Sequence, residues 1–295
     1  MSRSSSSIGS YHRLERADEC SIRNAQIEAR FAPWAGGRIV SLRHVDHGDI
    51  LVPLNDLHFA PDAWPKAGAF PLFPFHNRIR DAYFTMNDRR VRLRPNMANG
   101  RDVMHGPAHQ RPWDITEIGP TLLGMTLNYH ADDDWPFDFT ASQRFELCED
   151  GLSISLKLIN SGKTAMPGGI GWHPYFKPTS DDSIRVHSAR PAKKSRAGNR
   201  PGANDPITLD VAHHYSGWTH STVRIDTETS ATISLKGDAE LSYCAVLHKA
   251  DYLCIEPVSH LAGAFDAAPT LWPETGLRLL APGASMKGTA RLRVF

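Results

Sequence analysis

Residues 139 to 160 read FTASQRFELCEDGLSISLKLIN and carry the clearest hydrophobic repeat of the chain. The repeat has a period of two: Phe139, Ala141, Gln143, Phe145 and Leu147 alternate with polar residues, and so do Leu152, Ile154, Leu156 and Leu158. This period is typical of strands that bury one face. Glu149-Asp150-Gly151 supplies turn residues between the two arms, so the segment predicts an antiparallel hairpin.

Other segments repeat this pattern on both sides of the hairpin. YFTMNDRRVRL (83 to 93) places Asn87-Asp88 between two β-prone arms. Further strands are predicted at 37 to 45, 230 to 238, 242 to 249, 252 to 257 and 289 to 295. No stretch of twelve residues combines a helical apolar stripe with capping residues at both ends. With 22 glycines and 21 prolines, the sequence predicts an all-β antiparallel sandwich or barrel.

Composition indicates one ordinary globular domain. The chain has 295 residues, of which 41% are hydrophobic and 22% charged, and its formal net charge is +1. That charge predicts neither a nucleic acid nor a membrane partner. We expect residues 1–24 to be an N-terminal extension with a partly flexible start, and residues 25–295 to be a single domain. The first residues lack the apolar region of a signal peptide, which predicts a cytoplasmic protein.

Several kinds of chemistry are disfavoured by the motifs. The four cysteines are far apart, none forms a CxxC pair, and there is no HExxH, so no metal site is predicted. Cys244 and Cys254 lie in apolar, strand-like runs and are expected to be buried free thiols. GxSxG, GxGxxG and GxxxxGK[ST] are absent as well, which argues against a serine hydrolase and a nucleotide cofactor.

Four segments place polar side chains among aromatic residues and prolines, a combination that is typical of a polar binding site. They are AFPLFPFHNRIR (69 to 80), MHGPAHQRPWDI (104 to 115), GIGWHPYFKP (169 to 178) and CIEPVSHLAGAF (254 to 265).

Two of these segments hold candidate acid and base groups. Glu256 ends an apolar strand just before Pro257, where desolvation would raise the pKa of its carboxyl toward neutrality; the alternative is a strand-end carboxylate that points to water. His173 lies between glycines and Pro174, which predicts a bent backbone rather than a plain strand. Its imidazole is a possible proton donor or a structural residue packed among aromatics.

The other two segments hold candidate binding groups. His105, Gln110 and Arg111 offer hydrogen bonds, and the indole of Trp113 offers a flat apolar face, a combination that suits sugars; Trp113 is otherwise a packing residue. Arg78 follows an apolar run and is expected to anchor an ion pair or to bind substrate oxygens. The basic segment 189 to 205 is expected to be a solvated surface loop, with an anion-binding loop as the alternative.

Taken in order, the segments FPLFPFHNRIRDAYF, MHGPAHQRPWDI, GIGWHPYFKP, CIEPVSH and APGASMKGTARLRV resemble the aldose 1-epimerase (galactose mutarotase) family. The resemblance covers roughly residues 25 to 295, and the chain looks like the shorter bacterial branch. It implies a large antiparallel β-sandwich, the galactose mutarotase-like supersandwich. It also implies interconversion of the α and β anomers of a free aldose without a cofactor, by a monomer or homodimer whose partner is a small-molecule sugar.

The resemblance also implies roles for individual residues. Glu256 matches the family's general base and His173 its general acid, while Arg78 and His105 match residues that hold the sugar. Asn77, Trp113, Tyr175 and Asp210 are the remaining expected sugar contacts, although Asp210 is displaced from the family's position. Where many members have Asn before the catalytic His, this chain has Trp172. Two alternatives stay open: a hexose-6-phosphate mutarotase, and a carbohydrate-binding sandwich without catalysis.

Overall fold

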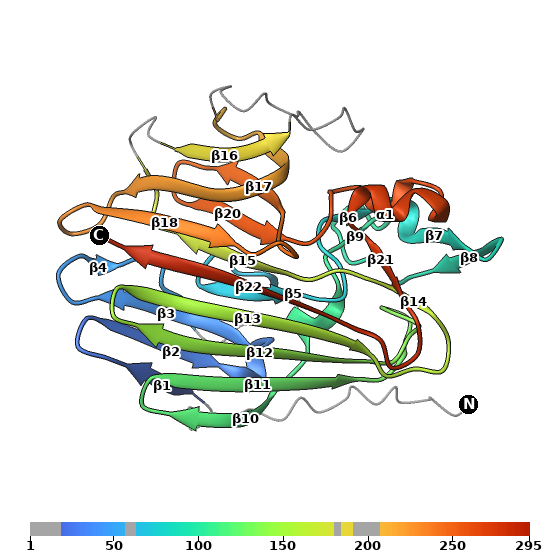
Figure 1. Ribbon diagram of the computed structural model, residues 1–295, viewed down its shortest axis with the longest axis horizontal. Helices are drawn as coiled ribbons and strands as arrows, with labels where there is room; N and C mark the ends of the chain where they lie inside the picture. The colour runs from blue at the N-terminus through green and yellow to red at the C-terminus, as the bar shows by residue number, and fades with distance from the viewer. Residues whose placement is uncertain (1–18, 57–62, 180–183, 191–206) are drawn as a thin grey trace, which may run out of the picture.

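One antiparallel sheet of sixteen strands carries most of the part of the chain that the structure describes (Figure 1). The structure is a computed structural model, and it describes residues 19–56, 63–179, 184–190 and 207–295. The strands of the sheet are β1 (Cys20–Arg23), β2 (Ile27–Ala32), β3 (Arg38–His44), β4 (Gly48–Asp49), β5 (Ala69–Leu72), β10 (Asp114–Gly119), β11 (Leu122–Tyr129), β12 (Phe139–Cys148), β13 (Gly151–Asn160), β15 (Gly171–Phe176), β16 (Arg185–Arg190), β17 (Ala212–Ile225), β18 (Ala231–Gly237), β19 (Tyr243–His248), β20 (Leu253–Val258) and β22 (Ser285–Val294).

The main path through the sheet is β1-β2-β3-β5-β15-β20-β19-β17-β18-β22-β13-β12-β11-β10, with β4 on β3 and β16 on β17. Three small ladders lie outside it: β6 (Arg78–Ile79) with β9 (Val103–Met104), β7 (Tyr83–Met86) with β8 (Arg89–Arg92), and β14 (Met166–Gly168) with β21 (Arg278–Leu280). The described helices are short: 3-10 turns at Pro33–Ala35, Arg80–Ala82, Pro107–Gln110, Ala264–Asp266 and Pro269–Leu271, and the α-helix α1 (Trp272–Thr275). None of them is long and apolar enough to cross a membrane.

The predicted hairpin is confirmed as β12 and β13, which pair from Phe139 opposite Asn160 to Cys148 opposite Gly151. Its alternating side chains enter the main core, where even Gln143 is buried and donates from Nε2 to the carbonyl oxygen of Gly37 at 3.1 Å. Strands near the two ends of the sheet order face each other across this core. Phe31 of β2 and Phe145 of β12, for example, have ring centroids 4.9 Å apart. The all-β sandwich and its antiparallel pairing are thus confirmed.

The other strand predictions are also confirmed. The hairpin at 83 to 93 becomes β7 and β8, and both of its turn residues, Asn87 and Asp88, have positive φ angles. Cys20–Arg23, inside the predicted N-terminal extension, pairs with β2 as the first strand of the sheet. Of the basic segment 189 to 205, the first two residues end β16 and the rest lies outside the described residues, so both interpretations of it remain open.

Backbone contacts bring two of the four predicted site segments together. The His105 N–H donates to the Asn77 carbonyl oxygen at 2.9 Å, and the Gly106 N–H donates to that of Phe75 at 3.0 Å. A Cβ on Gly106 would lie 2.1 Å from the carbonyl oxygen of Phe73. Because this contact is with backbone, only glycine lets the two segments approach so closely.

Gly106→Ala is therefore expected to lower the free energy of unfolding by about 1–3 kcal/mol, the usual effect of overpacking. Gly119→Ala is the matched control, because a Cβ there meets only the Cβ of Leu122 at 3.9 Å, and we expect a change within about 0.5 kcal/mol. Urea unfolding of the three proteins measures both effects. Equal stability of the two variants would contradict the prediction.

Candidate active site

The predicted acid and base lie on neighbouring strands, β15 and β20. The pairs Gly171 with Val258 and Tyr175 with Cys254 set the register, and counting inward from them places His173 opposite Glu256. Directly opposite residues point to the same face of a sheet and have closely spaced side chains. The expected bend around His173 is wrong: residues 171–176 form a central strand that is buried throughout and paired with β5 on its other side.

The side chains of this strand alternate between two hydrophobic clusters. Trp172 and Phe176 belong to the main core. Tyr175 belongs to a second cluster with Phe70, Leu72, Cys254 and Val258. We call the side of the sheet that carries this second cluster the site face. By the period of two, His173 and Glu256 project from the site face, between apolar neighbours.

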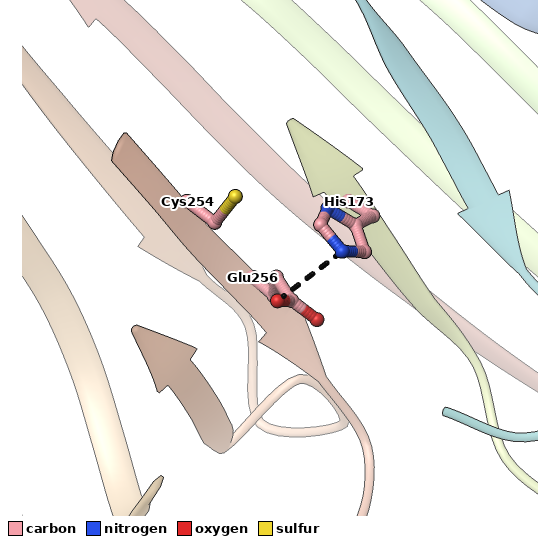
Figure 2. Close-up of side chains that lie close together, drawn as sticks. All are labelled: His173, Cys254 and Glu256. Atoms are coloured by element: carbon pink, nitrogen blue, oxygen red, sulfur yellow. Dashed lines mark ion pairs between the residues drawn. The ribbon is translucent and has the colours of Figure 1, made fainter. Parts of the chain in front are cut away.

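The two functional groups are in contact and nearly removed from solvent (Figure 2). Nε2 of His173 lies 3.4 Å from Oε1 of Glu256, and the two residues are 5% and 7% exposed. Within the described residues, neither Nδ1 of His173 nor Oε2 of Glu256 has a hydrogen-bond partner. Buried polar atoms are seldom left unpartnered, so both are candidates for hydrogen bonds to a bound ligand.

Aromatic rings fix the orientation of His173. Tyr175 stacks on it at 4.7 Å and 19°, and Phe70 packs at 4.6 Å and 33°. The Tyr175 hydroxyl accepts a hydrogen bond from Nε1 of Trp64 at 2.9 Å. Tyr175, predicted to contact the sugar, is only 2% exposed. Its contacts support a role in holding the imidazole.

Burial keeps both members of the pair in their neutral forms. Desolvation raises the pKa of Glu256 to about 8, although the positive charge of Lys66 opposes this shift. Desolvation also lowers the pKa of His173 well below its ordinary value, and the charges of Lys66 and Arg38 add to the effect. The empty pair therefore holds one proton near neutral pH, and burial favours its position on Glu256.

His105 lies beside the pair, with its ring 5.3 Å from that of His173 in an edge-to-face arrangement. Its Nδ1 accepts a hydrogen bond from the Asn77 N–H at 3.0 Å, so the neutral imidazole carries its proton on Nε2 as a donor. Burial lowers the pKa of His105 well below its ordinary value. Asn77, which has a φ of 62° and an Oδ1 that accepts from the Arg78 N–H, orients His105 through its backbone.

Arg78 is anchored by a carboxylate that the sequence analysis did not single out. Its Nη1 lies 3.1 Å from Oδ2 of Asp102, whose side chain is 1% exposed while that of Arg78 is 38% exposed. Asp102 also accepts hydrogen bonds from Asn99 Nδ2 and from the Asp81 N–H, and these bonds hold its pKa below the ordinary value, with the Asp81 N–H contributing most. The partly exposed guanidinium is thus fixed in direction yet still open to a ligand.

Two other predicted sugar contacts, Trp113 and Asp210, have protein partners in the structure. Trp113 is in the main core, where its Nε1 donates to the Ala108 carbonyl oxygen at 2.9 Å and its ring packs on Phe73. Its placement supports the packing alternative. Asp210 is in the turn before β17, with a 63% exposed side chain paired to Lys249 at 2.8 Å, and its contact with a sugar stays a prediction.

Trp172 does not alter the surroundings of the His173 imidazole, because alternation places the two side chains on opposite faces of β15. Trp172 is fully buried in the main core. The departure from the family at this position is therefore a difference in core packing.

Cys254 completes a set of three possible metal ligands with His173 and Glu256, whose ligand atoms all lie within 4.8 Å of one another (Figure 2). Zinc binds cysteine as the thiolate. Desolvation, with the nearby Glu256, raises the pKa of the Cys254 thiol well above its ordinary value. A metal bound here would have to displace the proton of this buried thiol. As predicted, Cys254 and Cys244 are buried free thiols.

Lys66, like Arg38, is a cation near the pair that sequence reasoning missed. Its Nζ lies 3.7 Å from the centre of the Trp64 ring, and its charge acts on Glu256, His173, His105 and His109. Nothing in the local sequence Trp-Pro-Lys distinguishes it from a surface lysine. Asp102, three residues before His105, carried a weak signal as an acidic residue beside a predicted site segment.

The fold has known relatives. A galactose mutarotase-like protein from Lactobacillus casei ATCC 334 superposes with a TM-score of 0.74 at 18% identity, over 94% of this chain and all of that one. A proposed aldose 1-epimerase from Escherichia coli K12 gives a TM-score of 0.77 at 22% identity, over 94% and 98%. These similarities confirm the galactose mutarotase-like sandwich.

Sequence comparison defines the family. The chain is 25% identical to the uncharacterized protein YphB of Escherichia coli (strain K12) over 252 residues, which cover 77% of this chain and 84% of YphB. The family model for aldose 1-epimerase matches residues 18–293. The chain belongs to the aldose 1-epimerase family.

Burial of Glu256 generates a prediction about stability. Its pKa rises from about 4.5 in the unfolded chain to about 8 in the folded protein, so ionisation costs more in the folded state. The wild type should lose stability as the pH rises from about 4.5 to about 8. Glu256→Gln removes this penalty, and its stability advantage should grow across that window to a few kcal/mol at most, because one pKa unit corresponds to about 1.4 kcal/mol.

Urea unfolding between pH 5 and 9 measures the effect. Glu28→Gln, at an exposed position of β2, is the control and should show no such trend. A constant difference between Glu256→Gln and wild type across the window would rule out the burial effect.

Proposed function

We propose that this protein is an aldose 1-epimerase that interconverts the α and β anomers of a free hexose or related aldose, without a cofactor. The observation that carries the proposal is the contact of 3.4 Å between His173 and Glu256 on the site face. Anomerisation needs one group that accepts a proton and one that donates a proton, each worth about 10² to 10⁴ in rate. The pair holds one proton, and within the described residues its Nδ1 and Oε2 atoms are buried without a hydrogen-bond partner, which supports this chemistry.

Ring opening uses the ionised form of the pair. Glu256, as general base, takes the proton of the C1 hydroxyl, and the electron pair of that O–H bond forms the C1 carbonyl. The bond between C1 and the ring oxygen breaks, and His173, as general acid, protonates that oxygen. The products are the open-chain aldehyde, protonated Glu256 and neutral His173. Burial favours this protonation state of the pair, as the directions of the two pKa shifts indicate.

Ring closure reverses both roles after rotation about the C1–C2 bond. His173 takes the proton from the hydroxyl that attacks C1, and Glu256 returns a proton to the carbonyl oxygen, which gives the other anomer. Between turnovers, the contact between Nε2 and Oε1 lets the proton move between the two groups. No proton is gained or lost over the cycle.

Two further donors support the proposal: His105, whose ring lies beside that of His173, and Arg78, which pairs in the β-ladder with Met104, the residue before His105. The guanidinium fork of Arg78, fixed by Asp102, suits paired sugar oxygens. The Nε2–H of His105 is a neutral donor that can stabilise charge developing on a reacting oxygen. Both are oriented before a ligand binds, so little entropy is lost on ordering them.

Loss of either proton-transfer group should abolish most of the activity. We expect Glu256→Gln and His173→Gln each to lower kcat by about 10² to 10⁴, measured by polarimetry of freshly dissolved α-D-glucose and α-D-galactose. Glu28→Gln is again the control and should leave the rate unchanged. Unaltered anomerisation in both active-site variants would refute the mechanism, and sugar binding without anomerisation by wild type would identify a binding protein instead.

The pH profile should follow the proton count of the pair. Above about pH 8 the empty pair loses its one proton through Glu256, so kcat/KM should fall on the alkaline side. On the acid side the decline should begin only below the ordinary histidine range, because the pKa of His173 is lowered. Exchange NMR between the two anomers measures the rate from pH 5 to 9, after subtraction of the buffer-catalysed rate. An alkaline limb that persists unchanged in Glu256→Gln would exclude this assignment.

A further inference from the structure

The strand register places another histidine in line with the catalytic pair. Glu256 lies opposite Ala245 of β19, and Ala245 lies opposite His214 of β17. On the other side, His173 lies opposite Phe70 of β5. One row therefore crosses five neighbouring strands in the order Phe70, His173, Glu256, Ala245, His214. Residues of one row share a face of the sheet, so His214 projects from the site face.

Only a small side chain separates His214 from Glu256 along this row. His214 and Glu256 are two strand spacings apart, about 10 Å between Cα atoms. The residue between them is Ala245, which contributes one methyl group. His214 is 5% exposed, and its charge acts on His76, which lowers the pKa of that buried imidazole after the larger effects of desolvation and of His260. His214 thus belongs to the same polar region as the pair.

The adjacent histidine has a different, structural role. His213 projects from the opposite face of β17, and its Nε2 accepts a hydrogen bond from the Thr208 N–H at 3.0 Å. Asp210 lies in the turn before β17 with a φ of 64°, outside the strand that carries His214, and pairs with Lys249. Of the acidic residue and two histidines in this stretch, the register brings only His214 into line with Glu256.

We propose that His214 is a specificity-determining residue that binds a polar substituent of the sugar, across Ala245 from Glu256. This inference rests on the proposed function for the identity of the ligand as a sugar. An imidazole donates as well as accepts hydrogen bonds, whereas a carboxylate only accepts them. His214 therefore admits substituents that only accept, such as a carboxylate, which an aspartate at this position would repel.

The test measures binding apart from catalysis. Dissociation constants for D-glucose, D-galactose, D-glucuronate and D-galacturonate are measured by calorimetry in Glu256→Gln protein, with and without His214→Ala. We expect His214→Ala to weaken binding of the preferred sugar about tenfold, the effect of one lost hydrogen bond in a buried site. In the active protein the same change should raise KM with kcat altered less than about threefold, because His214 is away from the reacting atoms.

Two further variants separate a direct contact from a structural role. His214→Gln retains a donor and an acceptor and should recover part of the affinity, while His214→Asp should weaken binding of the uronates at least tenfold more than binding of the neutral hexoses. His220→Ala, at a half-buried position of β17 stacked on His187, is the control and should bind as the parent does.

An unchanged dissociation constant in His214→Ala, or a loss confined to kcat, would overturn the proposal. If His214→Asp weakened the binding of uronates and of hexoses equally, the proposed role of His214 as a hydrogen-bond donor would be overturned. Sugar binding that depends on His214 in a wild-type protein without anomerase activity would reject the proposed function and leave this inference standing. Anomerase activity in the wild type, together with unchanged sugar binding in His214→Ala, would support the proposed function and overturn this inference.

Discussion

The register between β15 and β20 is the constraint on which the site depends. It sets His173 opposite Glu256 on one face, with 3.4 Å between the nitrogen and the oxygen. A shift of one residue would turn one of the two side chains into the main core. The register is specified strongly because Trp172, Phe176 and Ile255 must enter that core, so hydrophobic burial on one face positions the polar chemistry on the other.

Burial shapes the chemistry at a cost in stability. The same removal from water that raises the pKa of Glu256 to about 8 and lowers that of His173 disfavours any charge in the site. The burial of apolar side chains in the large main core stabilises the fold and offsets this cost. Aromatic stacking by Phe70 and Tyr175 then replaces the hydrogen bond that often orients a catalytic imidazole.

Sequence reasoning succeeded where the signal is local. The period of two between Phe139 and Leu158 predicted β12 and β13 because one face of that hairpin is buried along its whole length. Sequence reasoning was weaker at positions whose surroundings come from distant segments. Trp113 lies among aromatics and polar groups in sequence but packs in the main core, and the glycines and proline around His173 sit in a central strand that local chemistry does not favour.

By itself, the sequence determined the all-β class, most of the strands and, through five ordered motifs, the family and the residues proposed for acid and base. Only the tertiary structure decided which polar residues share the site with them. Asp102 reaches Arg78 across a loop, Lys66 acts on Glu256 from the segment before β5, and His214 lines up with Glu256 across one intervening strand, β19. Alternation tells which residues share a face of one strand, but alignment between strands depends on cross-strand packing, which is not local in the chain.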